Sequence, residues 1–342
     1  MSKPKRPAFT LVELLVVVVI ISMLVAMLLP AVIGARARAR QTQCQNNQHE
    51  LGLAALQYET QKNHFPGYLN GFGASTTPVK TPLNWCMTLL PYLGRNDLWQ
   101  ELTVGGDVSR AQKIVQWSTM QPPLKIPQFL CPDDQGAGKT LSYVANCGRV
   151  DPLAGLPSST VPSADLAFNG VFHNLFSFRQ PRLTASDIKD GAQQTLLFSE
   201  NLDNSFAALP ASWLYNVADD PSGRMTSEQM LGMMWFPLSA YGRGSTSGWW
   251  TFQPDPMLEP PWWPINQKAE PVQWPPPWYR PASNHTGGVV VTFCDGHQQF
   301  LSERIWYYTY IDLMTPDSSK AFAAVLNNAN YLRPTEEDPE LQ

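Results

Sequence analysis

An apolar run near the amino terminus constrains this chain of 342 residues more than any other feature. Between Phe9 and Leu29 the only charged residue is Glu13. A helix of roughly 20 apolar residues spans a bilayer, so residues 9–29 are predicted to form a transmembrane helix. A carboxylate in hydrocarbon is costly, and Glu13 is therefore predicted to have a function. Residues 1–8, MSKPKRPA, form a short basic leader before the run.

Two interpretations of this segment rest on general export signals. A secretory signal peptide would be removed after the run, and Ala35-Arg36-Ala37 offers small residues for such a cut. That site is overlong and rich in arginine, and the apolar region is longer than is usual for a signal peptide. An uncleaved signal anchor is the second interpretation, and it would leave the chain in the membrane.

The third interpretation starts from the small residue Ala8, which ends the leader and is followed by Phe9-Thr10-Leu11-Val12-Glu13. In this pattern the sequence resembles type IV prepilins and the pseudopilins of type II secretion. The resemblance implies that a prepilin peptidase cuts between Ala8 and Phe9, and that Phe9 is then N-methylated. It also implies that Glu13 pairs with the terminal amine of a neighbouring pilin-like subunit, which would offset the cost of burying the carboxylate. The family usually has Gly where this chain has Ala8.

The helix is predicted to continue beyond the membrane, because residues 31–62 contain no proline and few helix-breaking residues. We expect an extended amphipathic helix over residues 30–62, ended by His64-Phe65-Pro66-Gly67. Its apolar stripe repeats every seven residues at Ala37, Cys44, Leu51 and Tyr58.

Six further segments of the chain resemble a large planctomycete-type family of pilin-like proteins with a domain of unknown function, DUF1559, and they occur in the order found in that family. The last of them matches that family's H-x9-DG signature. This resemblance identifies a family and implies no biochemical role. The segments are Cys44–Gly67, Trp85–Leu93, Phe129–Asp133, Ser142–Gly148, Asp190–Glu200 and His285 with Asp295-Gly296.

The remainder, residues 63–342, is predicted to be one globular head of short strands, long irregular loops and few helices. The fold class is therefore α+β and pilin-like, with the long helix packed on a mainly antiparallel sheet. Strands are expected at 195–199, 289–294 and 297–301, and short helices at 110–117 and 318–328. A two-residue type I′ turn at Asp295-Gly296 would place Phe293 opposite Gln298 and Val291 opposite Phe300.

Residues 249–281 are rich in tryptophan and proline and are interpreted as an insertion in the head, while the acidic tail 333–342 is predicted to be disordered. The insertion is either a loop whose rings pack back on the sheet or an exposed aromatic surface that binds glycan or protein. Its candidate ligand surface comprises Trp249, Trp250, Trp262, Trp263, Trp274 and Trp278.

His285, Asp295 and His297 invite a metal or acid–base interpretation, but a strand over 288–294 would separate its ends by about 20 Å. We therefore predict that His285, Asp295 and Gly296 are structural, with no catalytic residue, metal or cofactor. Asp133-Asp134 and Asp219-Asp220 are more easily read as solvated acidic pairs than as calcium ligands. The pairing of the five cysteines stays open: Cys44, Cys86, Cys131, Cys147 and Cys294.

A net charge of −4 with no basic region in the head argues against a nucleic-acid partner. The function predicted is a non-enzymatic pilin or pseudopilin-like subunit. It would be single-pass in the inner membrane through residues 9–29, with its head in the periplasm or at the cell surface. The alternative is a surface-anchored binding module for glycan or protein that uses the prepilin segment only for export and anchoring. A hydrolase is disfavoured because the sequence lacks a catalytic motif.

Overall fold

The computed structural model separates into two compact units, residues 1–42 and residues 43–342, which are described separately here. The residues that the structure describes are 11–72, 81–104, 106–134, 138–149, 167–176, 181–202, 212–214, 232–235, 265, 281–305 and 307–321. Several predicted features lie outside them: Ala8 and Phe9, Asp219-Asp220, the six tryptophans of the insertion, and the tail 333–342.

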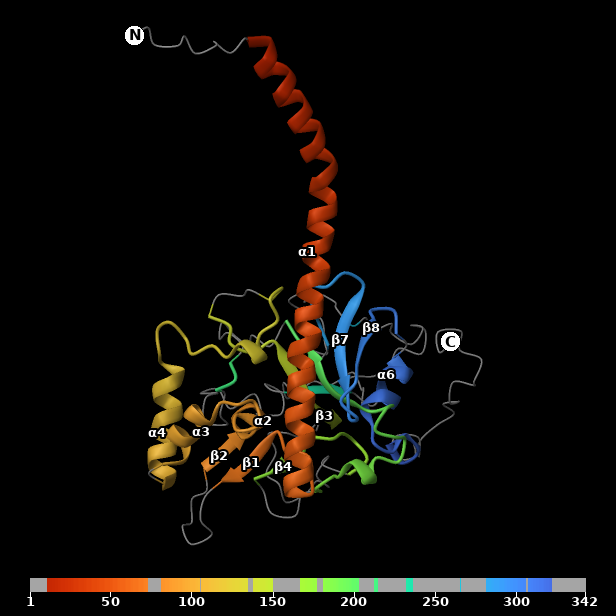
Figure 1. The fold of residues 1–342 in the computed structure, drawn as a ribbon. Helices are drawn as coiled ribbons and strands as arrows, with labels where there is room; N and C mark the ends of the chain where they lie inside the picture. The colour runs from red at the N-terminus through yellow and green to blue at the C-terminus, as the bar shows by residue number, and fades with distance from the viewer. Residues whose placement is uncertain are drawn as a thin grey trace, which may run out of the picture. The chain divides into compact units, whose positions relative to one another are not determined.

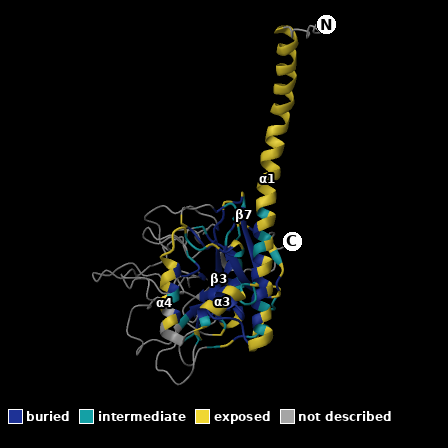
Figure 2. Cartoon of the chain, turned by 60° about the vertical axis from the view of Figure 1, so that its left-hand side comes forward, coloured by how far each residue is buried: buried dark blue, intermediate teal, exposed yellow. Residues whose placement is uncertain are grey.

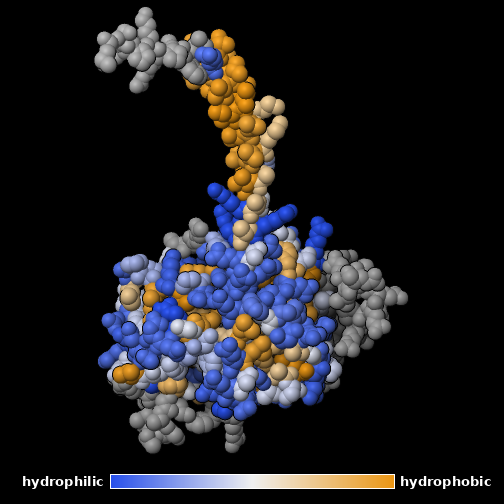
Figure 3. Space-filling model, in the orientation of Figure 1, coloured by the Kyte–Doolittle hydropathy of each residue, from blue (hydrophilic) through white to orange (hydrophobic). Residues whose placement is uncertain are grey.

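One helix, α1 (Leu11–Lys62), runs without a break through Pro30. It covers the predicted segment 30–62 and, from Leu11 on, the predicted segment 9–29. In the first unit its residues 11–40 are exposed, and its first part presents an apolar surface (Figure 3). By length and composition this part is long enough to cross a membrane. Ala37, the first residue of the predicted apolar stripe, is exposed as well.

In the second unit the carboxy-terminal part of α1 is half buried (Figure 2). Its buried positions recur at helical spacing: Cys44, Gln48, Leu51, Gly52, Ala54, Ala55 and Tyr58. The helix lies very close to strand β7 (Gly288–Phe293), because a Cβ atom on Gly52 would meet Thr292 Cγ2 at 2.9 Å. It ends with Asn63 in the left-handed conformation at φ 56°, a conformation found often after a helix.

The larger sheet has the strand order β6-β3-β5-β7-β8. Figure 1 labels its strands β3, β7 and β8. All of its described pairs are antiparallel except β3 with β6. β5 is buried at every position, which confirms the buried strand predicted there. The bounds are β6 Gly232–Trp235, β3 Tyr143–Arg149, β5 Leu196–Glu200 and β8 Gln298–Ser302.

A smaller sheet has the order β2-β1-β4, with β1 (Leu69–Phe72) antiparallel to β2 (Thr81–Asn84) and parallel to β4 (Asn174–Leu175). The predicted α+β class is confirmed. Further helical elements among the described residues are α2 Trp85–Leu89, α3 Asn96–Thr103, α4 Gly106–Ser118, η1 Pro127–Phe129, η2 Ala185–Asp187 and α6 Tyr307–Met314. The helix predicted over 110–117 lies within α4, and residues 318–321 are helical as far as the structure describes them.

Aromatic rings fill the core between these elements. Trp85 is fully buried, with its ring centroid 5.1 Å from that of Phe198 and 6.0 Å from that of Phe129. Trp213 continues the cluster at 5.9 Å from Phe129. These side chains are contributed by α2, β5, η1 and the described segment 212–214, so the core joins segments far apart in sequence.

The hairpin between β7 and β8 differs from the prediction by one residue. Thr292, not Phe293, lies opposite Gln298. The turn is closed by a hydrogen bond of 2.9 Å from Gly296 N to Phe293 O, and Gly296 has a φ of 91° whereas Asp295 has no positive φ. The loop is therefore a three-residue turn with a left-handed glycine, and the predicted two-residue type I′ turn was wrong. Asp295 instead accepts a 3.0 Å hydrogen bond from the backbone N–H of His297, which stabilises the longer turn.

Candidate functional site

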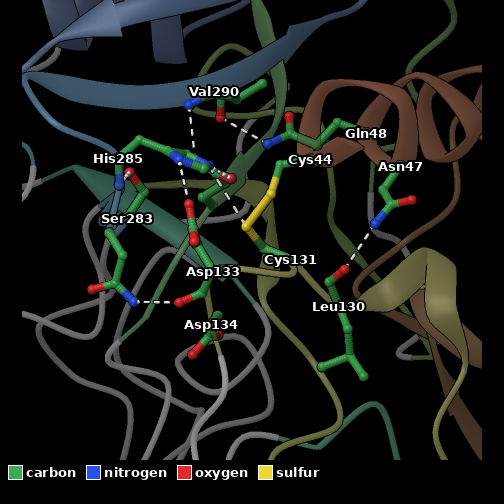
Figure 4. The surroundings of a disulfide bond; sticks show 12 residues. Cys44, Asn47, Gln48, Leu130, Cys131, Asp133, Asp134, Ser283, His285 and Val290 are labelled. Atoms are coloured by element: carbon green, nitrogen blue, oxygen red, sulfur yellow. Dashed lines mark hydrogen bonds and ion pairs between the residues drawn. A yellow bond between two sulfur atoms is a disulfide. The ribbon is translucent and has the colours of Figure 1, made fainter. Parts of the chain in front are cut away.

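A buried histidine, His285, lies between two carboxylates in the loop that precedes β7 (Figure 4). Its Nδ1 atom is 3.2 Å from Asp133 Oδ2, and its Nε2 atom is 3.1 Å from Glu200 Oε1. The side chains of His285 and Glu200 are almost fully buried, and that of Asp133 is 13% exposed. Both ring nitrogens therefore face acceptors, and a doubly protonated imidazolium can donate a hydrogen bond to each.

Glu200 is the last residue of β5 and is held by the neighbouring strand. Its Oε2 atom accepts a 2.9 Å hydrogen bond from Val290 N of β7. Its backbone carbonyl accepts another, also of 2.9 Å, from Ala282 N. A buried carboxylate needs such partners, because an unpaired one would be strongly destabilising. Glu200 thus fixes both the start of β7 and the loop that carries His285.

Asp133 lies on a turn that follows Cys131, in which Asp134 N donates to Cys131 O over 2.9 Å. The backbone carbonyl of Asp133 accepts from the side-chain amide of Asn284, the neighbour of His285, at 2.7 Å. Asp134 forms a buried ion pair of 2.7 Å with Lys139, and each of these side chains is 6% exposed. The interpretation of Asp133-Asp134 as a solvated acidic pair was therefore wrong.

A disulfide between Cys44 and Cys131 lies against this cluster and joins α1 to the turn of Asp133 (Figure 4). The Nε2 atom of His285 is 3.6 Å from the sulfur of Cys131. The other three cysteines are buried and form no disulfide: Cys86, Cys147 and Cys294.

Two polar side chains of α1, Asn47 and Gln48, attach the helix on either side of the disulfide. The amide nitrogen of Asn47 donates to Leu130 O at 2.7 Å, and that of Gln48 donates to Val290 O at 2.7 Å. Gln48 also accepts a 3.0 Å hydrogen bond from the hydroxyl of Thr292. Asn47 and Gln48 thus dock α1 on the loop of Leu130 and on β7.

The electrostatics of the cluster follow from its burial. Burial by itself lowers the pKa of His285, but the hydrogen bond and charge of Glu200, together with Asp133, outweigh it and leave the pKa above its ordinary value. Burial is also the largest influence on Glu200 and raises its pKa, against the lowering effect of His285. The raised pKa of His285 favours its imidazolium form, and the charge of that imidazolium offsets part of the effect of burial on Glu200.

The same cluster contains a set of donor atoms suited to a metal ion. One potential ligand atom from each of Cys44, Cys131, Glu200 and His285 lies within 4.8 Å of all the others. With the disulfide formed, the two sulfurs are not thiolates and are poor ligands. In this oxidised state the arrangement is an internal cross-link that connects α1, the turn of Asp133, β5 and the loop before β7.

The predicted motif residues occupy two different places. His285 belongs to the buried cluster, whereas Asp295 lies beyond the other end of β7 and contacts His297, with 2.6 Å between Oδ1 and Nδ1. Gly296 packs on α1, since a Cβ atom there would be 3.0 Å from Leu56 Cδ1. The structure brings His285 and Asp295 to different partners, as the length of the strand between them suggested.

Sequence reasoning did not single out the partners of His285. Two of them carried a signal that went unused: Asp133 and Glu200 each stand at the end of a segment that resembles the family. A glutamate at the end of an apolar strand was a further hint, since buried carboxylates require a partner.

Comparison with known families gives two matches. A family described as "Protein of unknown function (DUF1559)" matches residues 34–305, which include every residue of the cluster. A prokaryotic N-terminal methylation motif matches residues 3–29, which include Ala8, Phe9 and Glu13. No curated protein and no solved structure matches the chain.

Proposed function

The chain belongs to the DUF1559 family and is a type IV pilin-like prepilin, and on that premise we propose that it is a non-enzymatic subunit of a pilus or secretion pseudopilus. It would be anchored in the inner membrane by the first part of α1, with its head in the periplasm or at the cell surface. Its partners would be a prepilin peptidase and other pilin-like subunits.

The observation that carries this proposal is the N-terminal methylation motif directly joined to an exposed apolar helix. In the first unit, the large apolar side chains from Leu11 to Ile33 are between 44% and 80% exposed. Apolar surface of this extent requires lipid or other apolar helices around it. Both environments occur in a pilin-like assembly: lipid before polymerisation and neighbouring helices after it.

The disulfide supports export of the head. Disulfides persist in oxidising compartments such as the periplasm and are rare in the cytosol. The bond between Cys44 and Cys131 joins α1 to the head, so a head folded in this way fits a location outside the cytoplasm.

Glu13 is the residue proposed to act in assembly. It stands in the first turn of α1 as the structure describes it, within an apolar surface. After cleavage before Phe9, the terminal amine of a neighbouring subunit would supply the cation that makes a carboxylate tolerable in hydrocarbon.

The test measures N-terminal cleavage and subunit crosslinking in cells that carry the native peptidase. Intact-mass measurement should show loss of residues 1–8 and addition of a methyl group at Phe9. Glu13→Val should keep membrane insertion but lose crosslinking between neighbouring helices, whereas Leu24→Ala, a matched change in the same segment, should keep it. A mature chain that starts at Ala37 or later, or undiminished crosslinking in Glu13→Val, would contradict the proposal.

The surface binding module remains the alternative outcome of this test. Its candidate surface, the tryptophan-rich insertion, lies outside the described residues. Normal cleavage without any subunit crosslinking, combined with glycan-array binding that requires residues 249–281, would favour the binding module over the filament subunit.

A further inference from the structure

We propose that Cys44, Cys131, His285 and Glu200 form a binding site for a thiophilic divalent cation of the zinc class whenever the two cysteines are thiols. The cation and the disulfide would then be alternative cross-links between the same two segments, α1 and the turn of Asp133. This differs from the sequence-based expectation of no metal, which considered His285 together with Asp295 and His297.

The donor set is the first ground for the proposal. Two thiolates, one imidazole and one carboxylate are all ligand types that zinc accepts, and four ligands complete its tetrahedral shell. All four donor atoms lie within 4.8 Å of one another, and the Nε2 atom of His285 is 3.1 Å from Glu200 Oε1 and 3.6 Å from the sulfur of Cys131. A tetrahedron with bonds of about 2.0–2.3 Å has edges of about 3.3–3.8 Å, so these donors need to move by only about an ångström.

The surroundings of the donors are the second ground. A histidine that binds a metal usually donates its other ring N–H to a carboxylate, which fixes the ring and its tautomer. Here Nδ1 of His285 faces Asp133 Oδ2 at 3.2 Å, and Nε2 is directed at Glu200 and the sulfur. The second oxygen of Glu200 is held by Val290 N at 2.9 Å, leaving Oε1 toward the site. Both non-sulfur ligands are therefore already oriented by partners outside the donor set.

The burial of the site also suits a metal bound with the fold. Cys44 is 0% exposed, Cys131 4%, Glu200 1% and His285 6%. Buried ligands exclude water from a closed, four-coordinate shell, which is typical of structural and not catalytic zinc. The cation would bind while the head folds, before an oxidant joins the sulfurs.

Reduction of the disulfide and binding of the cation convert the first state into the second. A trialkylphosphine breaks the sulfur–sulfur bond, and the phosphine takes the oxygen of one water molecule while the two sulfurs take its two protons. When Zn²⁺ binds, both thiol protons, and any proton on Nε2 of His285, pass to the buffer.

The experiment uses the full chain in detergent, with Zn²⁺ alone as the probe. The protein is reduced with a phosphine, and the phosphine is removed in the absence of oxygen. Zn²⁺ is then titrated into the protein in competition with a chromophoric chelator. One tightly bound Zn²⁺ per chain is expected after reduction and none in the oxidised protein. Co²⁺ should give the intense visible bands of a tetrahedral site together with near-ultraviolet sulfur-to-metal absorption.

Variants identify the site. Cys44→Ser should abolish stoichiometric binding, and Asp133→Asn, which changes only the partner of His285, should weaken it by about 10–100-fold. Cys147→Ala is the matched control, because Cys147 is buried, forms no disulfide and lies outside the donor set, so its loss should leave zinc binding unchanged. If reduction unfolds the head, addition of Zn²⁺ should restore its near-ultraviolet circular dichroism.

Three results would overturn the proposal. They are a folded, reduced parent that binds no zinc, binding that persists in Cys44→Ser, and an unfolded, reduced parent that Zn²⁺ does not restore. None of them bears on whether the chain is cleaved before Phe9 or assembles through Glu13, so this test and that of the pilin-like function fail independently.

Discussion

Loss of the disulfide is expected to be the most damaging single chemical change to the second unit under oxidising conditions. The bond joins residues 87 positions apart, and a loop of this length restricts the unfolded chain severely. The loop-entropy relation gives a stabilisation of about 4–5 kcal/mol for it at 25 °C. Because whole domains are stable by only about 5–15 kcal/mol, Cys44→Ala should remove a large part of the stability of the head.

The assay is denaturant unfolding of the full chain in detergent, followed by tryptophan fluorescence without added metal. Cys44→Ala, Cys131→Ala and the double variant should lose about the same free energy of unfolding, because each removes the one cross-link. Cys147→Ala removes a buried sulfur without a cross-link and should cost less, about 1–2 kcal/mol. Additive losses in the two single variants, or losses no larger than that of Cys147→Ala, would show that the cross-link contributes little.

Three further predictions concern the contacts around β7. Gly296→Val should lower the free energy of unfolding by about 1–3 kcal/mol in thermal or chemical melts, because Gly296 has a φ of 91°. Asp295→Asn should have a smaller effect on stability. If Asp295→Asn were the more damaging change, the carboxylate would have a ligand or catalytic role. The pKa of His285 is raised in the folded protein. Its contribution to stability is therefore complete below the unfolded pKa of about 6.5 and is lost as pH rises through the folded pKa. The free energy of unfolding of His285→Gln, measured between about pH 6 and 9, should lack this decline. Gly52→Ala should cost about 1–3 kcal/mol because the new Cβ would meet Thr292 Cγ2 at 2.9 Å, and Thr292→Ser should recover part of the loss; no recovery would place the clash elsewhere.

Local features of the chain were readable from its sequence. Residues 11–62 form one helix, because an apolar run of membrane length favours a helix and the following segment consists mostly of good helix formers. Asn63 comes directly after its end. The buried strand at β5 was predicted from its apolar run. The hairpin itself was expected, but its register was not, because Asp-Gly fits both a two-residue turn and a longer turn in which only the glycine has positive φ.

The amino acid sequence by itself determined the elements that depend on neighbouring residues: the membrane-length helix, the leader that precedes it, and the residues that end or turn the chain. The tertiary structure alone decided which distant side chains meet at His285. Asp133 and Glu200 are 152 and 85 positions away from it in the sequence. No local periodicity of the sequence predicts a contact between residues so far apart. The same holds for the cysteines, because five thiols allow many pairings and only the packing of α1 against the turn of Asp133 brings Cys44 to Cys131. Periodicity reports on contacts within one element, whereas a buried cluster is made by the way separate elements pack.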